Sequence, residues 1–174
     1  MSAGPLQAEV LEIISTHYIY VRLCSIKDIF CLLQQSLTTF YCNDEHLQFT
    51  LQPETIPRPG QSYAVSMPAA WYRGVVMNTI KDMDTTLVRL IDVGRLVEVS
   101  ASTLVNLAPP FLTENAFSSP VHLSQLSQQS EMNREVVNYM KELLRDQEVV
   151  TLLRRAPPKV VDGQWSLPVE TCED

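Results

Sequence analysis

The segment from residue 62 to residue 99 most constrains the fold, because four short apolar or β-branched stretches follow one another in it with tight polar connections. Apolar and polar residues alternate along these stretches, as expected of strands with two different faces. Strands this short and this close together are typical of a small, strongly bent antiparallel barrel. The predicted strands are 62–66, 71–80, 86–91 and 96–99.

A cluster of chain-breaking residues precedes the predicted barrel, and we place a module boundary there. Upstream of it, residues 10–14 and 17–23 are apolar and β-branched, which predicts two strands joined by a turn at Ser15-Thr16. A helix is predicted next, because five apolar residues recur at spacings of three and four. The chain breakers are Pro53, Pro57, Pro59 and Gly60, and the helix face is Ile26, Phe30, Leu33, Leu37 and Phe40.

Mixed elements follow the barrel. A short helix is predicted over 111–119, and Ser130 is a plausible N-cap for a longer helix that carries Met140 on its apolar side. Residues 148–153 and 165–169 are predicted to be strands. A chain of 174 residues is long enough for one large domain or two interleaved small ones.

The composition excludes several classes of protein. No apolar run approaches the roughly 20 residues of a membrane helix, and residues 1–5 do not resemble a signal peptide. We expect the chain to be a piece of a longer protein. Its net charge of −7 suits a basic partner better than nucleic acid, although the charge has an equally good alternative explanation in solubility.

No residue pattern points to catalysis, a cofactor or a metal. The four cysteines form no C-x-x-C pair and lie far from the histidines, so zinc ligation is not predicted. Cys24 and Cys31 are predicted to be small buried hydrophobes in a reduced, cytosolic setting. Neither a G-x-S-x-G turn nor a phosphate-binding glycine loop occurs. Asp82 and Asp84 are close together on a predicted turn, where solvation is a better explanation than metal binding.

Residues around the last tight turn of the barrel are the candidate binding site. Aromatic rings at a barrel rim can hold a cation, and Tyr72, Leu90, Val93 and Arg95 flank that turn. Only Tyr72 of these is aromatic, and it fits a core position equally well, whereas Trp71 fits the core better. 

The turn also has a candidate framework. Arg73 and Asp92 could pair and fix the rim, or form a surface ion pair of little consequence. Gly94 is expected to supply a positive φ.

Two motifs in this region resemble those of Tudor domains. The run Trp71-Tyr72-Arg73-Gly74-Val75-Val76 is similar to their W-Y-R-A-x-V strand, and Ile91-Asp92-Val93-Gly94-Arg95 is similar to their I-D-Y-G-N turn. The flanking elements resemble the extended Tudor architecture, in which the barrel is inserted into a split staphylococcal-nuclease-like OB fold. This resemblance implies a mostly β fold with linking helices. Its expected parts are the nuclease-like halves, 1–58 and 112–174, and the Tudor barrel, 59–111.

The resemblance also implies a ligand, and it predicts that the site for it is altered. Extended Tudor domains read Arg-rich N-terminal tails of PIWI-family Argonautes, in which a cage of four aromatics and one Asn holds symmetrically dimethylated arginine. The cage positions carried over to this sequence are Ser66 (with Met67 beside it), Tyr72, Leu90, Val93 and Arg95. Loss of three rings removes a few kcal/mol of cation binding, at about 0.5–2 kcal/mol for each ring.

From the resemblance we expect a non-catalytic scaffold module of the germline piRNA silencing pathway. It would bind an unmethylated PIWI-family tail through an apolar rim, in the groove between the barrel and the nuclease-like half. Trp71, Arg73, Asp92 and Gly94 would form the scaffold of that rim. The resemblance places the protein in the cytoplasm, in perinuclear germ granules (nuage).

Two alternatives remain. One is a structural module that does not bind peptides, or that self-associates through regions outside this chain. The other is a nuclease or weak RNA-binding module, which the acidic charge disfavours.

Overall fold

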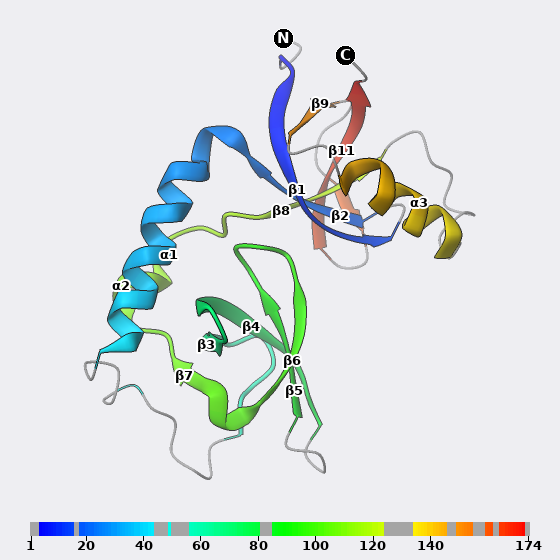
Figure 1. Ribbon diagram of the computed structural model, residues 1–174. Helices are drawn as coiled ribbons and strands as arrows, with labels where there is room; N and C mark the ends of the chain where they lie inside the picture. Colours follow the sequence, from blue (N-terminus) through cyan, green and yellow to red (C-terminus); the bar gives the residue numbers. More distant parts are fainter. Residues whose placement is uncertain are drawn as a thin grey trace. The chain divides into compact units, whose positions relative to one another are not determined.

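The computed structural model describes residues 4–15, 18–43, 49, 56–80, 85–123, 134–145, 149–154, 159–161 and 164–172. The chain forms two compact units, shown in Figure 1. Unit 1 contains Met1–Lys27 and Ser118–Asp174, and unit 2 contains Asp28–Phe117. Unit 2 is therefore an insertion in the sequence of unit 1, and it holds the whole 59–111 segment together with the helix that precedes it.

Unit 1 is a small barrel built from both ends of the chain. Its strands lie in the order β10-β11-β8-β2-β1-β9, and β11 also pairs with β9, which closes the ring. Strands β8 and β11 pair in parallel, whereas the other pairs are antiparallel. Register shifts in β1 mark bulges, which let a strand bend around a barrel. The strands are β1 (Leu6–Ser15), β2 (Tyr18–Leu23), β8 (Ser119–Leu123), β9 (Val150–Arg154), β10 (Lys159–Val161) and β11 (Gln164–Cys172).

Helix α3 (Arg134–Arg145) covers part of the unit 1 core. Val137 and Met140 of this helix pack against apolar side chains that come from five of the strands. The core is therefore formed jointly by the two ends of the chain. Its buried members are Ala8, Ile13, Ile19, Val21, Val121, Val150, Leu152 and Val169.

Unit 2 is a five-stranded antiparallel sheet in the order β6-β5-β4-β3-β7. Its strands are short except for β4, which carries a register shift between Val76 and Asn78. Two helices flank the strands in the sequence, α1 (Lys27–Cys42) and α2 (Pro109–Leu112). The strands are β3 (Ser62–Met67), β4 (Ala70–Ile80), β5 (Thr85–Leu90), β6 (Leu96–Ser100) and β7 (Leu104–Asn106).

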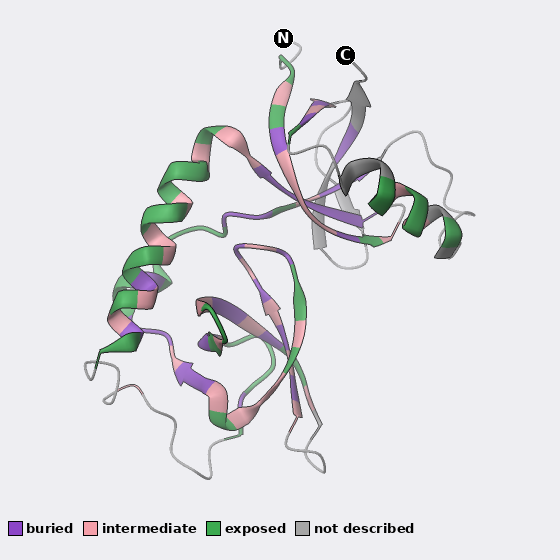
Figure 2. Ribbon diagram, viewed as in Figure 1, coloured by how far each residue is buried: buried purple, intermediate pink, exposed green. Residues whose placement is uncertain are grey.

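The hairpin of β3 and β4 has a separate apolar core on each of its two faces. One face carries Tyr63, Val65 and Val76, which pack with residues of β5 and β7. The other face carries Ala64 and Trp71, which pack against Leu37 of α1 and against the segment after β7. Figure 2 shows the result: buried residues lie along these strands, while much of α1 remains exposed.

Most of the predicted elements are confirmed, and the errors have physical causes. The strand pair β1–β2, helix α1 and strands β3 to β6 occur where the sequence predicts them. The predicted helix over 111–119 is wrong: α2 ends at Leu112, and Ser119 begins strand β8. Strand β8 is stabilised by pairing with β2 and β11, which are distant in sequence, so local patterning does not reveal it. Strand β10 was not predicted either.

Burial of the cysteines also differs from expectation. Cys24 is half-buried. Cys31 is exposed, because it lies outside the face of α1 that packs on the barrel. Ser130, the turn 81–84 with its two aspartates, and the chain breaker Pro53 lie outside the described residues.

Tyr41 joins α1 to the end of the barrel. Its hydroxyl donates to the carbonyl of Asn106 at 2.9 Å and accepts from the Ala108 amide at 2.8 Å. Its ring stacks on Trp71, with centroids 5.0 Å apart and an interplanar angle of 26°. Burial raises the pKa of the Tyr41 phenol above its ordinary 10.0, although the Ala108 hydrogen bond acts in the opposite direction. The Tyr41 side chain therefore connects α1 to the end of β7 and to the residues that follow β7.

Tyr41→Phe is expected to lower the free energy of unfolding by about 2 kcal/mol, because two buried backbone groups lose their partner. Urea unfolding measures this, and Tyr139→Phe, at an exposed site, is the control. A raised folded-state pKa means that the unfolded chain loses its proton first as pH increases. The free energy of unfolding should therefore fall as the pH rises above 10.0, and it should fall more steeply in the parent than in Tyr41→Phe. Identical alkaline slopes would contradict this assignment.

Gly74 is required by packing inside the barrel. A Cβ at this position would lie 2.4 Å from Val88 Cγ1 and 2.7 Å from Val65 Cγ2. Both neighbours are β-branched and stiff, so they cannot rotate away easily. The two valines thus fill the space that a side chain at position 74 would need.

Gly74→Ala is therefore expected to destabilise the protein by about 1–3 kcal/mol through overpacking. Val88→Ala removes one of the two clashing side chains. Adding Gly74→Ala to the Val88→Ala protein should therefore lower the midpoint of urea unfolding less than adding it to the parent. A Gly74→Ala protein as stable as the parent would show that the strands can separate at no cost.

Candidate functional site

A buried ion pair holds the turn between β5 and β6. Arg73 Nε donates to Asp92 Oδ2 at 2.9 Å, and Nη2 donates to Asp92 Oδ1 at 2.6 Å. The two side chains are 1% and 3% exposed, so the pair is part of the interior rather than a surface ion pair. A bidentate arginine–carboxylate contact fixes both distance and orientation. The candidate framework of the rim is thus rigidly connected to the centre of β4.

The remaining N–H groups of Arg73 bind one carbonyl of α2 and two carbonyls of the segment that follows it. Nη1 donates to the carbonyls of Phe111 and Glu114, at 2.9 and 2.8 Å, and Nη2 donates to that of Asn115 at 2.9 Å. A guanidinium has five N–H donors, and all five are used here. Asp92 Oδ1 in turn accepts the Phe117 amide at 3.1 Å. One buried arginine therefore organises both the turn and an irregular segment without secondary structure of its own.

The turn itself has the backbone that the sequence predicts. Gly94 has a φ of 72°, in the region where glycine is favoured. Its amide donates to the Leu90 carbonyl at 2.8 Å, and the Leu90 amide donates to the Arg95 carbonyl at 2.8 Å. The Ile91 amide donates to the Arg73 carbonyl at 3.0 Å. These bonds place the last residue of β5 and the residues of the turn in one compact loop.

Four of the predicted rim residues share one apolar cluster of the barrel. Met67, Tyr72 and Val93 are half-buried, and all three pack against the core that contains Leu90. Tyr72 pairs across the hairpin with Val65, a buried member of that core. Leu90 is only 2% exposed, so it forms the floor of this surface rather than its wall. We call Met67, Tyr72, Leu90 and Val93 the apolar rim.

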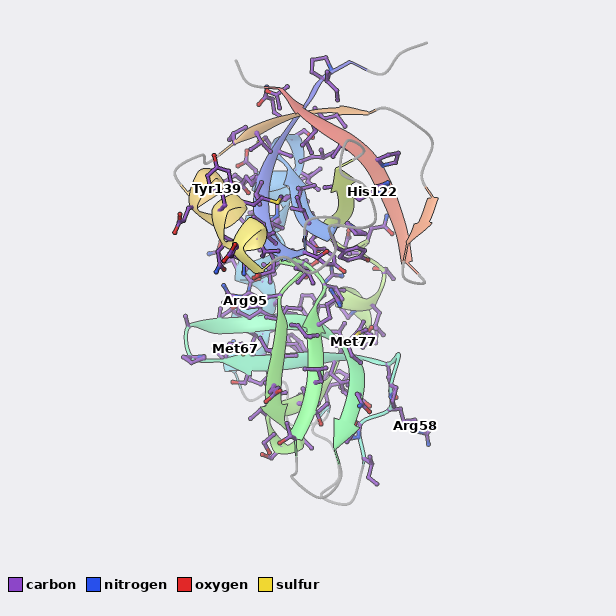
Figure 3. All side chains as sticks on the ribbon, turned by 90° about the vertical axis from the view of Figure 1, so that its right-hand side faces the viewer. Arg58, Met67, Met77, Arg95, His122 and Tyr139 are labelled. Carbon is purple, nitrogen blue, oxygen red and sulfur yellow. The ribbon has the colours of Figure 1, made fainter. Side chains whose placement is uncertain are left out.

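The other two predicted positions lie differently. Ser66 is exposed and pairs with Trp71, so strand alternation puts it on the face opposite Met67. Met67, and not Ser66, therefore occupies the rim side of β3. Arg95 is exposed, and its carbonyl is bound to Leu90. Figure 3 shows the labelled Met67 and Arg95 toward one side of the barrel and Met77 toward the other.

Trp71 does not belong to the apolar rim. It lies on the Arg73 face of β4, where it stacks on Tyr41. Its amide donates to Thr38 Oγ1 at 3.3 Å, and its carbonyl accepts from Gln34 Nε2. Polar side chains of α1 thus take the place of a neighbouring strand as hydrogen-bond partners of the Trp71 backbone. Trp71 packs as part of a core, which is the better of its two sequence interpretations.

Several residues that shape the site had little or no sequence signal. Tyr41 follows Leu37 at a helical spacing of four, and that spacing could have placed it on the packed face of α1. Gln34 and Thr38 bind backbone atoms that are distant in sequence, and no local pattern predicts such bonds. Phe117, whose ring lies 5.9 Å from the Arg73 guanidinium, follows an irregular segment.

Within the described residues, no group of three or more His, Cys, Asp or Glu side chains could hold a metal ion. The same residues contain no helix that is long and apolar enough to span a membrane. The apolar rim offers one aromatic ring, aliphatic surface and a nearby exposed cation, which together suit an apolar group better than a cation.

Arg73→Met is expected to lower the free energy of unfolding by about 3–5 kcal/mol, because Asp92 keeps its charge in the interior without its partner. Arg73→Lys should recover only part of this, since an ammonium cannot reproduce the five-donor fork. Arg58→Met, at an exposed arginine, is the control in the same urea titration. Equal midpoints for the Arg73 and Arg58 variants would contradict a central role for the pair.

Comparison with solved structures places this architecture among extended Tudor domains. One similar structure is the extended Tudor domain of Drosophila melanogaster Papi, solved in complex with a Piwi N-terminal peptide carrying me2s arginine. Its sequence is 17% identical to this chain. That alignment covers 97% of this chain and 89% of the other, with a TM-score of 0.80. The same domain with an unmethylated Piwi peptide gives 16% identity, the same coverage and a TM-score of 0.81.

A third similar structure is an extended Tudor domain of mouse TDRD1 in complex with a MILI peptide that contains dimethylarginine. It is 16% identical over 98% of this chain and 83% of the other, with a TM-score of 0.75. A search of curated protein sequences finds no match. The family model described as "Tudor domain" matches residues 5–125, which is more than half of the chain. With this match and the extended Tudor architecture of both units, the chain belongs to the Tudor domain family.

Proposed function

We propose that this chain is a non-catalytic module that binds the basic N-terminal tail of a PIWI-family Argonaute without requiring arginine methylation. The observation that carries the proposal is the composition of the apolar rim. Met67, Tyr72, Leu90 and Val93 lie together around the turn held by Arg73, but only Tyr72 supplies a ring. The solved relatives with Piwi and MILI peptides support a peptide ligand of this class.

The rim lacks what a methylated cation needs. A cation over a ring face gains about 0.5–1 kcal/mol at an exposed site, and several rings are needed for a marked preference. Leu90 is buried in the floor, so it cannot act as a wall around a guanidinium. Arg95 adds a positive charge close to the turn. Aliphatic contact with Met67 and Val93 is the interaction that this surface supports best.

The charge of the chain supports a basic ligand even though the rim is apolar. A net charge of −7 attracts an Arg-rich tail over a distance set by ionic strength, and it does not distinguish methylated from unmethylated arginine. The Papi domain has been solved with both forms of a Piwi peptide. Perinuclear germ granules are the location that such a ligand implies for this chain.

The first test is a calorimetric titration with matched PIWI-family tail peptides, unmodified and symmetrically dimethylated. The two Kd values should differ by less than about fivefold, because one ring supplies only about 1 kcal/mol. Tyr72→Ala should weaken both peptides by a similar factor. A tenfold or greater preference for the methylated peptide would overturn methylation independence.

A gain-of-function variant sharpens the test. Val93→Tyr/Arg95→Asn introduces one ring and the amide at a half-buried and an exposed position of the turn. It should introduce a preference for the dimethylated peptide while binding of the unmodified peptide changes little. Val149→Tyr/Arg58→Asn, which makes the same chemical changes at exposed positions outside the apolar rim, is the matched control. Failure of both peptides to bind the parent protein would reject the proposed function itself.

A further inference from the structure

A groove in unit 2 lies on the side of the β3–β4 turn that faces α1. It has a volume of about 370 Å³ and is lined mainly by apolar atoms. The turn between β3 and β4 connects two surfaces, because Met67 packs in the apolar rim whereas Ala69 and Ala70 line the groove. The other lining residues all belong to α1 and are Phe30, Cys31, Gln34, Gln35, Thr38 and Thr39.

Two of the polar residues that line this groove are bound to the backbone of Trp71. Gln34 Nε2 donates to the Trp71 carbonyl, and Thr38 Oγ1 accepts from the Trp71 amide at 3.3 Å. The apolar part of the lining is the ring of Phe30, the thiol of Cys31 and two alanines, and the exposed Gln35 and Thr39 complete it. Such a surface binds an apolar side chain, because it offers no charged group to a polar one.

The charges around the Phe30 end of the groove are acidic. Asp28 is exposed one helical turn before Cys31, on the same side of α1. Glu114 is exposed in the segment that leads to Phe117, whose ring lies 5.9 Å from that of Phe30. Lys27, the basic residue at the start of α1, is paired with Glu9 at 2.5 Å. The remaining residues of α1, from Asp28 to Cys42, include no basic side chain.

We propose that this groove is a second peptide-binding site, which takes an aliphatic side chain flanked by basic residues. The aliphatic group fills the space beside Phe30 and Ala70, and a flanking basic residue lies near Asp28 and Glu114. None of the residues that line the groove belongs to the apolar rim, so the two sites can be altered separately. The groove proposal therefore goes beyond the proposed function and can be tested independently of it.

The two exposed cysteines of α1 provide the test. Cys31 lines the groove, while Cys42 is exposed at the end of the same helix and does not. The probe is a Gly/Ser peptide with one leucine between two arginines. Alkylation by iodoacetamide, followed at each cysteine by mass spectrometry, should slow at least fivefold at Cys31 and remain unchanged at Cys42. Equal rates at Cys31 with and without saturating probe would overturn the proposal.

Two control peptides separate the two parts of the recognition. Replacing the leucine by serine, or both arginines by glutamate, should abolish protection of Cys31 at the same concentration. Full protection by the glutamate peptide would overturn the predicted preference for basic flanks. Slower alkylation of Cys31 with increasing protein concentration alone would assign the groove to a second copy of the chain, which also contradicts the proposal.

A pair of helix variants locates the site. Thr39→Arg introduces a cation at the lining, and Ser36→Arg introduces the same group at an exposed position outside it. The first should weaken the probe about tenfold, the loss expected when an apolar contact is replaced by like charge. The second should change Kd by less than twofold. Equal effects of both variants would show only a long-range charge effect and would reject this site.

The outcome is independent of the rim. Val93→Tyr/Arg95→Asn should leave protection of Cys31 unchanged, because neither position contacts the groove. If the probe fails while PIWI-family tail peptides still bind, the groove proposal falls and the proposed function stands. If the probe protects Cys31 but no tail peptide binds, the groove proposal stands and the proposed function falls.

Discussion

The buried guanidinium of Arg73 is the interaction on which unit 2 depends. It joins β4 to the turn after β5 through Asp92, to one carbonyl of α2, and to two carbonyls of the segment after α2. A buried charge is tolerated only when its partners are complete, and here all five donors are used. The same residue thus fixes both the turn and the irregular segment, and the turn carries Val93 of the apolar rim.

The sequence predicts the local parts of this arrangement and not the distant ones. Alternation in β3 to β6, the helix face of α1 and the positive φ of Gly94 all follow from residues within a few positions of one another. Strand β8 fails this test, because its pairing partners β2 and β11 lie at the two ends of the chain. The carbonyl partners of Arg73 are equally hidden, since an irregular segment has no period from which its course could be predicted.

Strand alternation decides which of the predicted site residues can act together. Counting positions from a motif places the first rim residue at Ser66, but the pleat turns Ser66 away and presents Met67. Burial adds a second correction that no motif contains, because Leu90 is the floor of the surface and is closed to a ligand. A motif specifies positions, whereas the pairing register specifies faces. Only the combination of the two describes a binding surface.

The contact between Phe30 and Phe117 has a consequence for how the chain is assembled. These residues lie at the two ends of unit 2, and their rings are 5.9 Å apart. Strands β2 and β8 of unit 1 lie just outside those ends, so their pairing closes a loop of roughly 90 residues, at an entropic cost that grows with loop length. Once unit 2 has folded, the same connection behaves as a short bridge. A folded unit 2 therefore shortens the effective length of the loop that the pairing of β2 and β8 closes, and so lowers its entropic cost.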